Sequence, residues 1–219
     1  MRGNEVEPSL YAADFTRLGE QIQTLMRAGV RIFHFDIGDG HFVPPVTIGP
    51  IVLESISPLV HRLGGRIDCH LMVEEPQRHF EAVAQAGGDS VTFHIEAARN
   101  PDAVARLARQ HELQVGLAFK PETEPEQAAD VAEPFDIVLC MSIEPGYSGQ
   151  PFMPEALPRI ERLRELLPEE KPIQVDGGIG HGNVRLVKNA GASLYVAGTS
   201  IFGGWDIAIA YEELVAELA

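Results

Sequence analysis

Short apolar runs alternate with longer amphipathic stretches along this chain, and the alternation is typical of repeated strand–helix units and a parallel sheet. Eight of the runs are rich in β-branched or other apolar residues, and we predict that they form strands. They span residues 7–12, 31–36, 66–72, 90–95, 113–119, 135–141, 171–176 and 193–198. Between them, apolar residues recur at helical spacing in 15–28 and 156–167, and a last helix is expected at about 205–218.

Eight strand–helix units in 219 residues leave about 27 residues for each unit, which suits a compact (β/α)8 barrel. An open, doubly wound sheet is the alternative, and it would more naturally use five or six strands with a Gly-x-Gly-x-x-Gly turn after the first. The first strand here is followed by Ala13-Asp14-Phe15, which contains no glycine. We therefore predict an α/β fold, a single (β/α)8 TIM barrel over residues 1–219, with 1–6 as a flexible N-terminal extension.

The charge balance excludes several classes of protein. Lys and Arg number 17 against 32 for Asp and Glu, and the net charge of −15 would repel nucleic acid and anionic lipid. No run reaches the roughly 18 to 20 apolar residues of a membrane-spanning helix, and no secretion signal precedes the first strand, so we expect a cytoplasmic protein. Cys69 and Cys140 each lie in an apolar stretch, where a cysteine is usually a small core residue.

Polar residues at the carboxyl ends of the predicted strands are the candidates for chemistry, because barrels build their active face there. His34 and Asp36 are two residues apart and therefore face the same side of one strand. His70 and Asp176 lie near the ends of two others. Two imidazole nitrogens and two carboxylate oxygens suit zinc, iron, manganese or cobalt better than magnesium or calcium. Each residue alone could be a hydrogen-bonded residue at a strand end, but the combination favours a metal site.

Glycine-rich turns follow the last three predicted strands. Residues 144–150, 176–179 and 197–200 would let backbone N–H groups approach an anion closely. The loops after strands seven and eight commonly bind phosphate in such barrels, although glycines also close ordinary turns. Neutral backbone donors would hold a phosphate despite the negative net charge, and the turns therefore predict a phosphate site.

Five segments of the chain, taken in order, resemble the ribulose-phosphate 3-epimerase family. They are PSL at 8–10, HFDIGDGHFVP at 34–44, DCHLM at 68–72, MSIEPGYSGQPF at 141–152 and VDGGI at 175–179. The resemblance spans about residues 7–202, and the Asp-Gly-His-Phe-Val-Pro and Pro-Gly-x-x-Gly-Gln motifs are highly specific. It implies a barrel of the ribulose-phosphate-binding type that interconverts D-ribulose 5-phosphate and D-xylulose 5-phosphate with one bound divalent metal.

The same resemblance implies roles for individual residues. Asp36 and Asp176 would exchange the C3 proton as an acid/base pair through an enediolate. The implied metal ligands are His34, Asp36, His70 and Asp176. Zinc is the preferred metal, and iron, manganese and cobalt fit the same ligands. The implied substrate-binding residues are Ser9, His70, Met72, Met141, Gly146, Tyr147, Ser148, Gly149, Gly177, Gly178, Gly198 and Thr199. We further expect a homo-oligomer whose partner is a small-molecule ketose phosphate.

Other polar and sulfur-bearing residues have two interpretations each. His94, near the end of the fourth strand, either orients a metal ligand or is a plain buried histidine. His41 is expected to be solvated or packed within the loop after the second strand. Met72 and Met141, taken without the resemblance, are more typical of core packing.

Departures from the family pattern gather at the predicted mouth of the barrel. The family usually has an aliphatic residue at Tyr11, serine at Ala12 and methionine at Gly38. Glu144 precedes Pro-Gly where asparagine is common, and Ser148 replaces a glycine. We expect the glycine at 38 to enlarge or reshape the pocket and Glu144 to bring a carboxylate towards the phosphate. A 2-ketohexose 6-phosphate such as allulose 6-phosphate is therefore an alternative substrate.

Two other functions have weaker support in the sequence than an epimerase has. Decarboxylases and hexulose-phosphate synthases that resemble orotidine-phosphate decarboxylase carry Asp-x-Lys-x-x-Asp at the third strand. Here that stretch begins Asp68-Cys69-His70, with histidine in place of the lysine. A non-catalytic sugar-phosphate-binding barrel would have no need of two opposed carboxylates. The sequence therefore favours an isomerase.

Overall fold

Eight parallel strands form the inner wall of a barrel, and the predicted fold class is confirmed. A computed structural model describes residues 4–219. The strands are hydrogen-bonded in the order β1-β8-β7-β6-β5-β4-β3-β2, and a bridge between Ser9 and His34 joins the two ends. Their bounds are β1 Glu5–Pro8, β2 Ile32–Gly38, β3 Arg66–Met72, β4 Ser90–His94, β5 Gln114–Phe119, β6 Ile137–Met141, β7 Ile173–Asp176 and β8 Leu194–Ala197.

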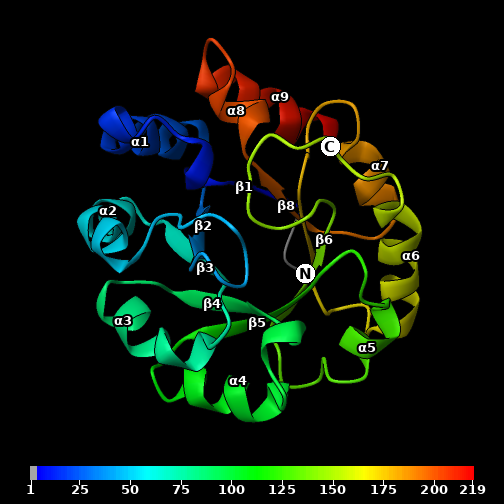
Figure 1. Cartoon of the computed structure of the whole chain (residues 1–219). Helices are drawn as coiled ribbons and strands as arrows, with labels where there is room; N and C mark the ends of the chain where they lie inside the picture. Colours follow the sequence, from blue (N-terminus) through cyan, green and yellow to red (C-terminus); the bar gives the residue numbers. More distant parts are fainter. Residues whose placement is uncertain (1–3) are drawn as a thin grey trace.

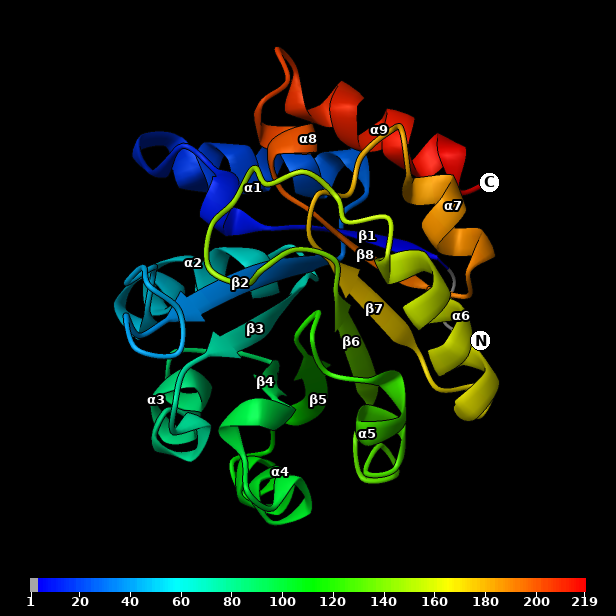
Figure 2. The ribbon, with the colours of Figure 1, turned by 45° about the vertical axis from the view of Figure 1, so that its right-hand side comes forward.

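Helices surround the strands, and each strand leads into at least one of them (Figure 1). The α-helices are α1 Leu18–Ala28, α2 Pro50–Arg62, α3 Phe80–Gln85, α4 Pro101–Arg109, α5 Pro125–Ala129, α6 Ala156–Leu166, α7 Val184–Asn189, α8 Thr199–Phe202 and α9 Ile207–Glu217. Short 3-10 helices are η1 Leu10–Ala12, η2 Phe15–Arg17, η3 Pro76–Arg78 and η4 Ile95–Ala97. Figure 2 shows α9 beside α1, where the last helix meets the first. Within residues 4–219, no helix is long and apolar enough to cross a membrane.

The apolar spacing of α1 explains both its formation and its position. Leu18, Ile22 and Leu25 fall on one face of the helix and are buried against the barrel. Burial of each such side chain contributes about 1.5–3 kcal/mol, which is more than the differences in helix propensity among ordinary residues. Gly29 ends the helix in the left-handed region at φ 112°, and its N–H donates to the last carbonyl oxygens.

The first strand lies earlier than the predicted 7–12. Residues 10–12 form η1 instead of a strand, while the strand itself includes two glutamates. One of them, Glu7, is only 1% exposed because it points into the barrel. Of the predicted flexible extension, residues 1–3 lie outside the described residues, whereas Glu5 and Val6 already belong to β1.

Alternation along β2 separates the apolar core from the polar interior of the barrel. Phe33 and Phe35 belong to the main apolar cluster, which also contains residues of α1 and α2. His34 and Asp36 are buried as well, but face the other side of the strand. The two cysteines are free and buried in the same cluster, as predicted for small core residues.

Candidate metal centre and active site

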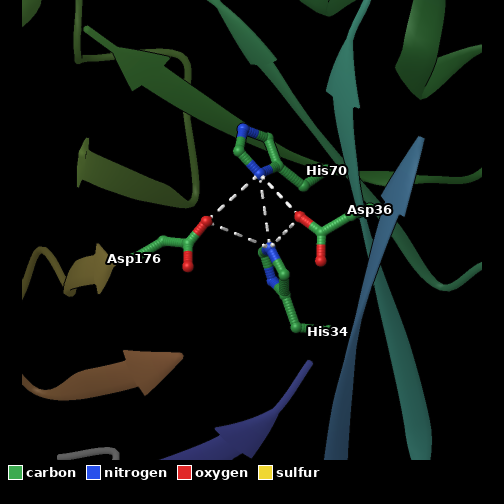
Figure 3. Close-up of side chains that lie close together, drawn as sticks. All are labelled: His34, Asp36, His70 and Asp176. Carbon is green, nitrogen blue, oxygen red and sulfur yellow. Dashed lines mark hydrogen bonds and ion pairs between the residues drawn. The ribbon is translucent and has the colours of Figure 1, made fainter. Parts of the chain in front are cut away.

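Four side chains from three strands converge inside the carboxyl end of the barrel. His34 and Asp36 come from β2, His70 from β3 and Asp176 from β7, and one donor atom of each lies within 4.8 Å of the others (Figure 3). His34 Nε2 and His70 Nδ1 are 3.3 Å apart, and each lies 3.4 Å from Asp36 Oδ1. Asp176 Oδ2 lies 3.9 Å from His34 Nε2 and 3.6 Å from His70 Nδ1.

The register of the sheet produces this convergence. Asp36 is paired with His70 across β2 and β3, so the two side chains leave the sheet at the same height. Asp176 is the last residue of β7. The hydroxyl of Ser142 shares its proton between the backbone carbonyl of Asp176, at 3.0 Å, and that of Gly177, at 2.7 Å. These bonds fix the end of the strand from which the fourth donor projects.

The donor set fits a divalent transition metal. Two buried imidazole nitrogens and two carboxylate oxygens are the ligands that zinc and its neighbours take, and the remaining nitrogen of each ring faces a partner outside the cluster. His34 Nδ1 lies 3.2 Å from Asp68 Oδ2, at ion-pair distance although out of line for a hydrogen bond. His70 Nε2 lies 2.9 Å from His94 Nε2. The inward nitrogens are therefore free to share one cation.

Buried charges in this cluster shift the pKa values of its members. Burial by itself would lower the pKa of His34, but the carboxylates of Asp36, Asp68 and Asp176 raise it well above the ordinary value. Burial likewise opposes ionisation of Asp36, yet the facing imidazoles of His34 and His70 hold its pKa far below the usual range. The cluster thus strongly favours a positive charge between its carboxylates, which a protonated imidazole or a divalent cation supplies.

Ser9 contacts one of the two aspartates directly. It follows β1 and is only 7% exposed, and its hydroxyl donates to Asp36 Oδ2 at 2.6 Å. The other carboxylate oxygen, Oδ1, faces the two imidazoles. Ser9 therefore orients Asp36 so that one oxygen points towards the centre.

A small cavity of about 40 Å³ adjoins the cluster at the loops after β6, β7 and β8. It is lined by Ser9, Ile143, Ser148, Gly149, Asp176, Gly177, Gly178, Ile179, Val196, Gly198 and Thr199. Gly177 and Gly178 have φ values of 125° and 65°, which favour glycine, and α8 begins at the cavity immediately after Gly198. A Cβ on Gly198 would lie 3.3 Å from both Ala12 Cβ and Ser148 Oγ, so the glycine keeps this corner open.

Replacement of Gly177 by alanine is expected to destabilise the barrel by at least about 2 kcal/mol. The added Cβ would meet Ile143 Cγ1 at 2.4 Å and the Ile143 backbone nitrogen at 2.8 Å, at a φ that alanine rarely adopts. Urea denaturation measures the change. Gly182→Ala is the matched control, because no heavy atom lies within 4 Å of the added Cβ there. Equal stability of the two variants would contradict the expectation.

Comparison with known proteins identifies the family. The sequence model of the ribulose-phosphate 3 epimerase family matches residues 5–202. The chain belongs to the ribulose-phosphate 3-epimerase family. Ribulose-phosphate 3-epimerase of Bacillus subtilis is 36% identical over 214 residues, covering 96% of this chain and 97% of that protein. The Schizosaccharomyces pombe epimerase is 39% identical over 198 residues, covering 90% and 86%. The chain is thus an enzyme of the epimerase class, as predicted.

Solved structures with similar folds carry other names. A 3-hexulose-6-phosphate synthase has a TM-score of 0.75 at 20% identity, covering 98% of this chain and 100% of that one. A structure of KGPDC from Streptococcus mutans has a TM-score of 0.76 at 14% identity, covering 100% and 98%. At such identities the similarity shows the barrel alone. Epimerase family membership therefore separates this chain from synthases and decarboxylases.

The substrate-binding residues implied by the epimerase resemblance fall into two groups in the structure. One group lines the cavity or belongs to the donor cluster: Ser9, His70, Ser148, Gly149, Gly177, Gly178, Gly198 and Thr199. Outside the cavity lining, Met72, Met141 and Gly146 are buried, whereas Tyr147 is 56% exposed. Glu144 is also exposed and outside the lining, so its carboxylate is not directed into the cavity as expected.

Glycine in place of the family's methionine at position 38 does not leave an open space. A Cβ on Gly38 would meet Val43 Cγ2 at 2.9 Å, the Pro45 carbonyl oxygen at 3.0 Å and Thr47 Cγ2 at 3.1 Å. The loop after β2 occupies the volume that a side chain would need. Of the two expected effects, an enlarged pocket finds no support at this position, because no empty space lies beside the glycine. A reshaped wall stays a prediction.

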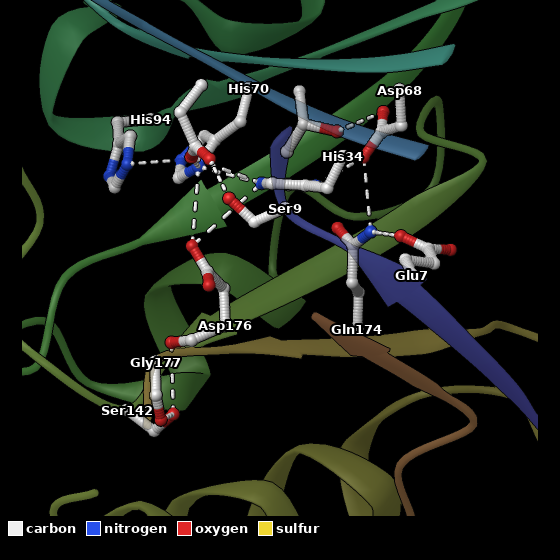
Figure 4. A network of polar contacts seen from close by, with 12 residues as sticks. Glu7, Ser9, His34, Asp68, His70, His94, Ser142, Gln174, Asp176 and Gly177 are labelled. Carbon is white, nitrogen blue, oxygen red and sulfur yellow. Dashed lines mark hydrogen bonds and ion pairs between the residues drawn. The ribbon is translucent and has the colours of Figure 1, made fainter. Parts of the chain in front are cut away.

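A buried polar layer lies on the amino-terminal side of the donors, and no motif in the sequence indicates it (Figure 4). The Gln174 side-chain amide donates to Glu7 and, at 3.1 Å, to Asp68 Oδ2. Burial raises the pKa of Glu7 to about 8, whereas the His34 imidazole lowers the pKa of Asp68 to about 2 against the effect of burial. Glu7, Asp68 and Gln174 each precede a site residue by two positions, a spacing that places them on the same inward face.

A second cavity, of about 200 Å³, lies beyond this polar layer at the amino-terminal ends of the strands. Its lining includes Glu7, Asp68 and Gln174, but none of the four donor residues. Barrel enzymes build their active sites at the carboxyl ends of the strands. The smaller cavity beside the donors is therefore the candidate active site, despite its size.

Proposed function

We propose that this enzyme inverts C3 of a ketose phosphate, interconverting D-ribulose 5-phosphate and D-xylulose 5-phosphate. The observation that carries the proposal is the placement of Asp36 and Asp176 on opposite sides of the two imidazoles (Figure 3). Inversion requires a base on one face of the carbon and an acid on the other. Two carboxylates that approach one centre from β2 and β7 meet that requirement.

His34, Asp36, His70 and Asp176 would hold one divalent metal, and Zn²⁺ is the proposed ion because it takes mixed histidine and carboxylate ligands. When bound, the metal supplies positive charge that stabilises the enediolate oxygens of the substrate. Iron, manganese and cobalt would fit the same donors.

The two aspartates share the proton transfers. One carboxylate removes the C3 proton from its face, and the protonated partner returns a proton to the opposite face, so that the two exchange protonation states in each turnover. Ser9 holds Asp36 Oδ2 at 2.6 Å and leaves Oδ1 towards the centre. The carbonyl bonds from Ser142 hold the strand end that carries Asp176. Both groups are thus fixed before the substrate binds, which reduces the ordering that turnover requires.

Backbone groups at the end of the barrel would bind the phosphate. Gly177 and Gly178 line the cavity after β7, and Gly198 with Thr199 lines it at the start of α8. The loops after strands seven and eight, with a short extra helix, are the common phosphate site of this fold. Neutral N–H donors suit a dianion in a chain whose net charge is −15.

Deuterium exchange at C3 tests the function and the choice of substrate. In deuterated water with zinc-loaded enzyme, ribulose 5-phosphate is expected to exchange its C3 proton and to epimerise. Both reactions are expected to be faster than those of allulose 6-phosphate. The curated relatives are named ribulose-phosphate 3-epimerases, and this supports the pentulose as the substrate. NMR follows both reactions. Exchange only with the hexulose would favour the alternative substrate, and no exchange with either would contradict the epimerase mechanism. The homo-oligomeric state stays a prediction.

A further inference from the structure

We propose that His94 and Glu96 position His70 by fixing its proton on Nε2, so that Nδ1 is presented to the metal. The inference rests on the proposed metal centre. His94 is the last residue of β4 and is fully buried, and Glu96 lies two residues on in η4. Neither residue belongs to the donor cluster or lines the small cavity.

The direction of the hydrogen bonds follows from the geometry of His70. Its Nδ1 faces the centre, 3.4 Å from Asp36 Oδ1 and 3.6 Å from Asp176 Oδ2. A histidine that binds a metal through Nδ1 carries its proton on Nε2, so the Nε2–H of His70 donates to His94 Nε2 at 2.9 Å. His94 must then be the neutral tautomer with its proton on Nδ1.

Glu96 selects that tautomer of His94. The Nδ1–H of His94 donates to Glu96 Oε2 at 3.2 Å, and a carboxylate can only accept. Glu96 is itself held through Oε1, which accepts from the Lys120 backbone N–H at 2.9 Å and from the Thr123 hydroxyl. The hydrogen-bond chain therefore runs in one direction, from His70 through His94 to a carboxylate anchored by the loop after β5.

Aromatic packing holds the rings in this alignment. The planes of the His70 and His94 rings are 22° apart and their centroids are 5.0 Å apart, so the rings meet edge to edge, as an in-plane hydrogen bond between their Nε2 atoms requires. Phe42 covers His94 at a centroid distance of 4.8 Å, and Lys120 Nζ lies 4.1 Å from the Phe42 ring centroid. Phe42 belongs to the Asp-Gly-His-Phe-Val-Pro motif, and Asp39 Oδ1 holds its backbone N–H at 2.8 Å. Through Phe42, this motif therefore packs against the imidazole that contacts the proposed metal ligand His70.

The other histidine of the donor cluster is held differently. His34 turns its Nδ1 directly towards the carboxylate of Asp68, with no second imidazole between them. Removal of His94 should therefore affect His70 alone and leave the other three donors in place. Partners of this kind typically contribute 10- to 100-fold, as an order-of-magnitude range, to metal affinity.

The test measures the Zn²⁺ dissociation constant by competition with a chromophoric chelator. We expect His94→Leu to weaken binding by about 10- to 100-fold, because the Nε2–H of His70 loses its acceptor. His94→Gln, whose side-chain oxygen can accept the same bond, should recover most of the affinity. Glu96→Ala should give an intermediate loss. His61→Leu is the matched control. His61 lies on the outer helix α2, where its imidazole is 3.0 Å from the Asp89 carboxylate, and its removal should leave the zinc dissociation constant unchanged.

The outcomes separate this inference from the metal centre itself. If the wild-type chain does not bind zinc, the proposed centre fails, and the inference with it. If the wild type binds zinc and both His94→Leu and Glu96→Ala bind equally well, only the positioning role is overturned. Glu96 has a partly exposed side chain, so its variant still decides the matter if His94→Leu does not fold. Thermal unfolding of the chelated proteins checks that the folds are comparable.

Discussion

Asp176→Asn is expected to lower turnover of ribulose 5-phosphate by about 10³-fold, within the range that general acid–base catalysis supplies. Asparagine keeps the shape of the side chain and can still offer an oxygen, but it cannot take up or deliver the C3 proton. The barrel should remain folded, because the bonds that anchor this strand end go from Ser142 to backbone carbonyls. Steady-state kinetics at saturating zinc, with the metal content measured, provides the test.

Proton exchange in the same variant gives a sharper result than turnover. With one of two opposed groups removed, Asp36 can still remove and return the C3 proton on its own face. We therefore expect exchange with deuterated water, without inversion, for one of the two epimers only. Asp102→Asn, on the exposed surface of α4, is the control and should keep normal turnover. Normal epimerisation by Asp176→Asn would refute the two-aspartate assignment.

Removal of the metal is expected to reduce turnover by about 10²- to 10⁴-fold, since stabilisation of enediolate charge by a divalent ion contributes several kcal/mol. Added Zn²⁺, Co²⁺, Mn²⁺ or Fe²⁺ should restore activity, because each accepts two imidazoles and two carboxylates. Mg²⁺ should not, because it prefers oxygen ligands. Full activity of a dialysed, metal-free enzyme would contradict the proposed role, and restoration by Mg²⁺ would contradict the proposed ligand set.

The proposals concern different parts of one site. We propose that the aspartates move protons, that the glycine loops bind phosphate, and that the hydrogen-bond chain through His94 acts only through a metal ligand. The loss of turnover in an aspartate variant should thus persist at saturating zinc, whereas the loss of turnover in a His94 variant should be relieved by excess zinc. This difference distinguishes a catalytic residue from a positioning residue in a single assay.

Local pattern was sufficient for most of the strands, although not for the bounds of β1, and for the donors themselves. The range of β3 agrees with its prediction, and every residue of the strand after Arg66 is buried, as a short, largely apolar run between polar turns indicates. His34 and Asp36 were assigned to one face because side chains in a strand alternate with a period of two. The family motifs, which lie at the ends of strands, implied the same donors.

The partners of those donors depended on the closed barrel. Gln174 and Glu7 are 167 residues apart in sequence, and their contact exists because β7 and β1 both border β8. The same holds for His70 with His94, and for the loop that fills the space beside Gly38. For β2 and β3, the alternation along the strand alone indicates which residues point inward and which chemical groups they carry. Which of the inward groups touch depends on the folded barrel, because strand register, ring rotation and loop packing together set distances that no local pattern contains.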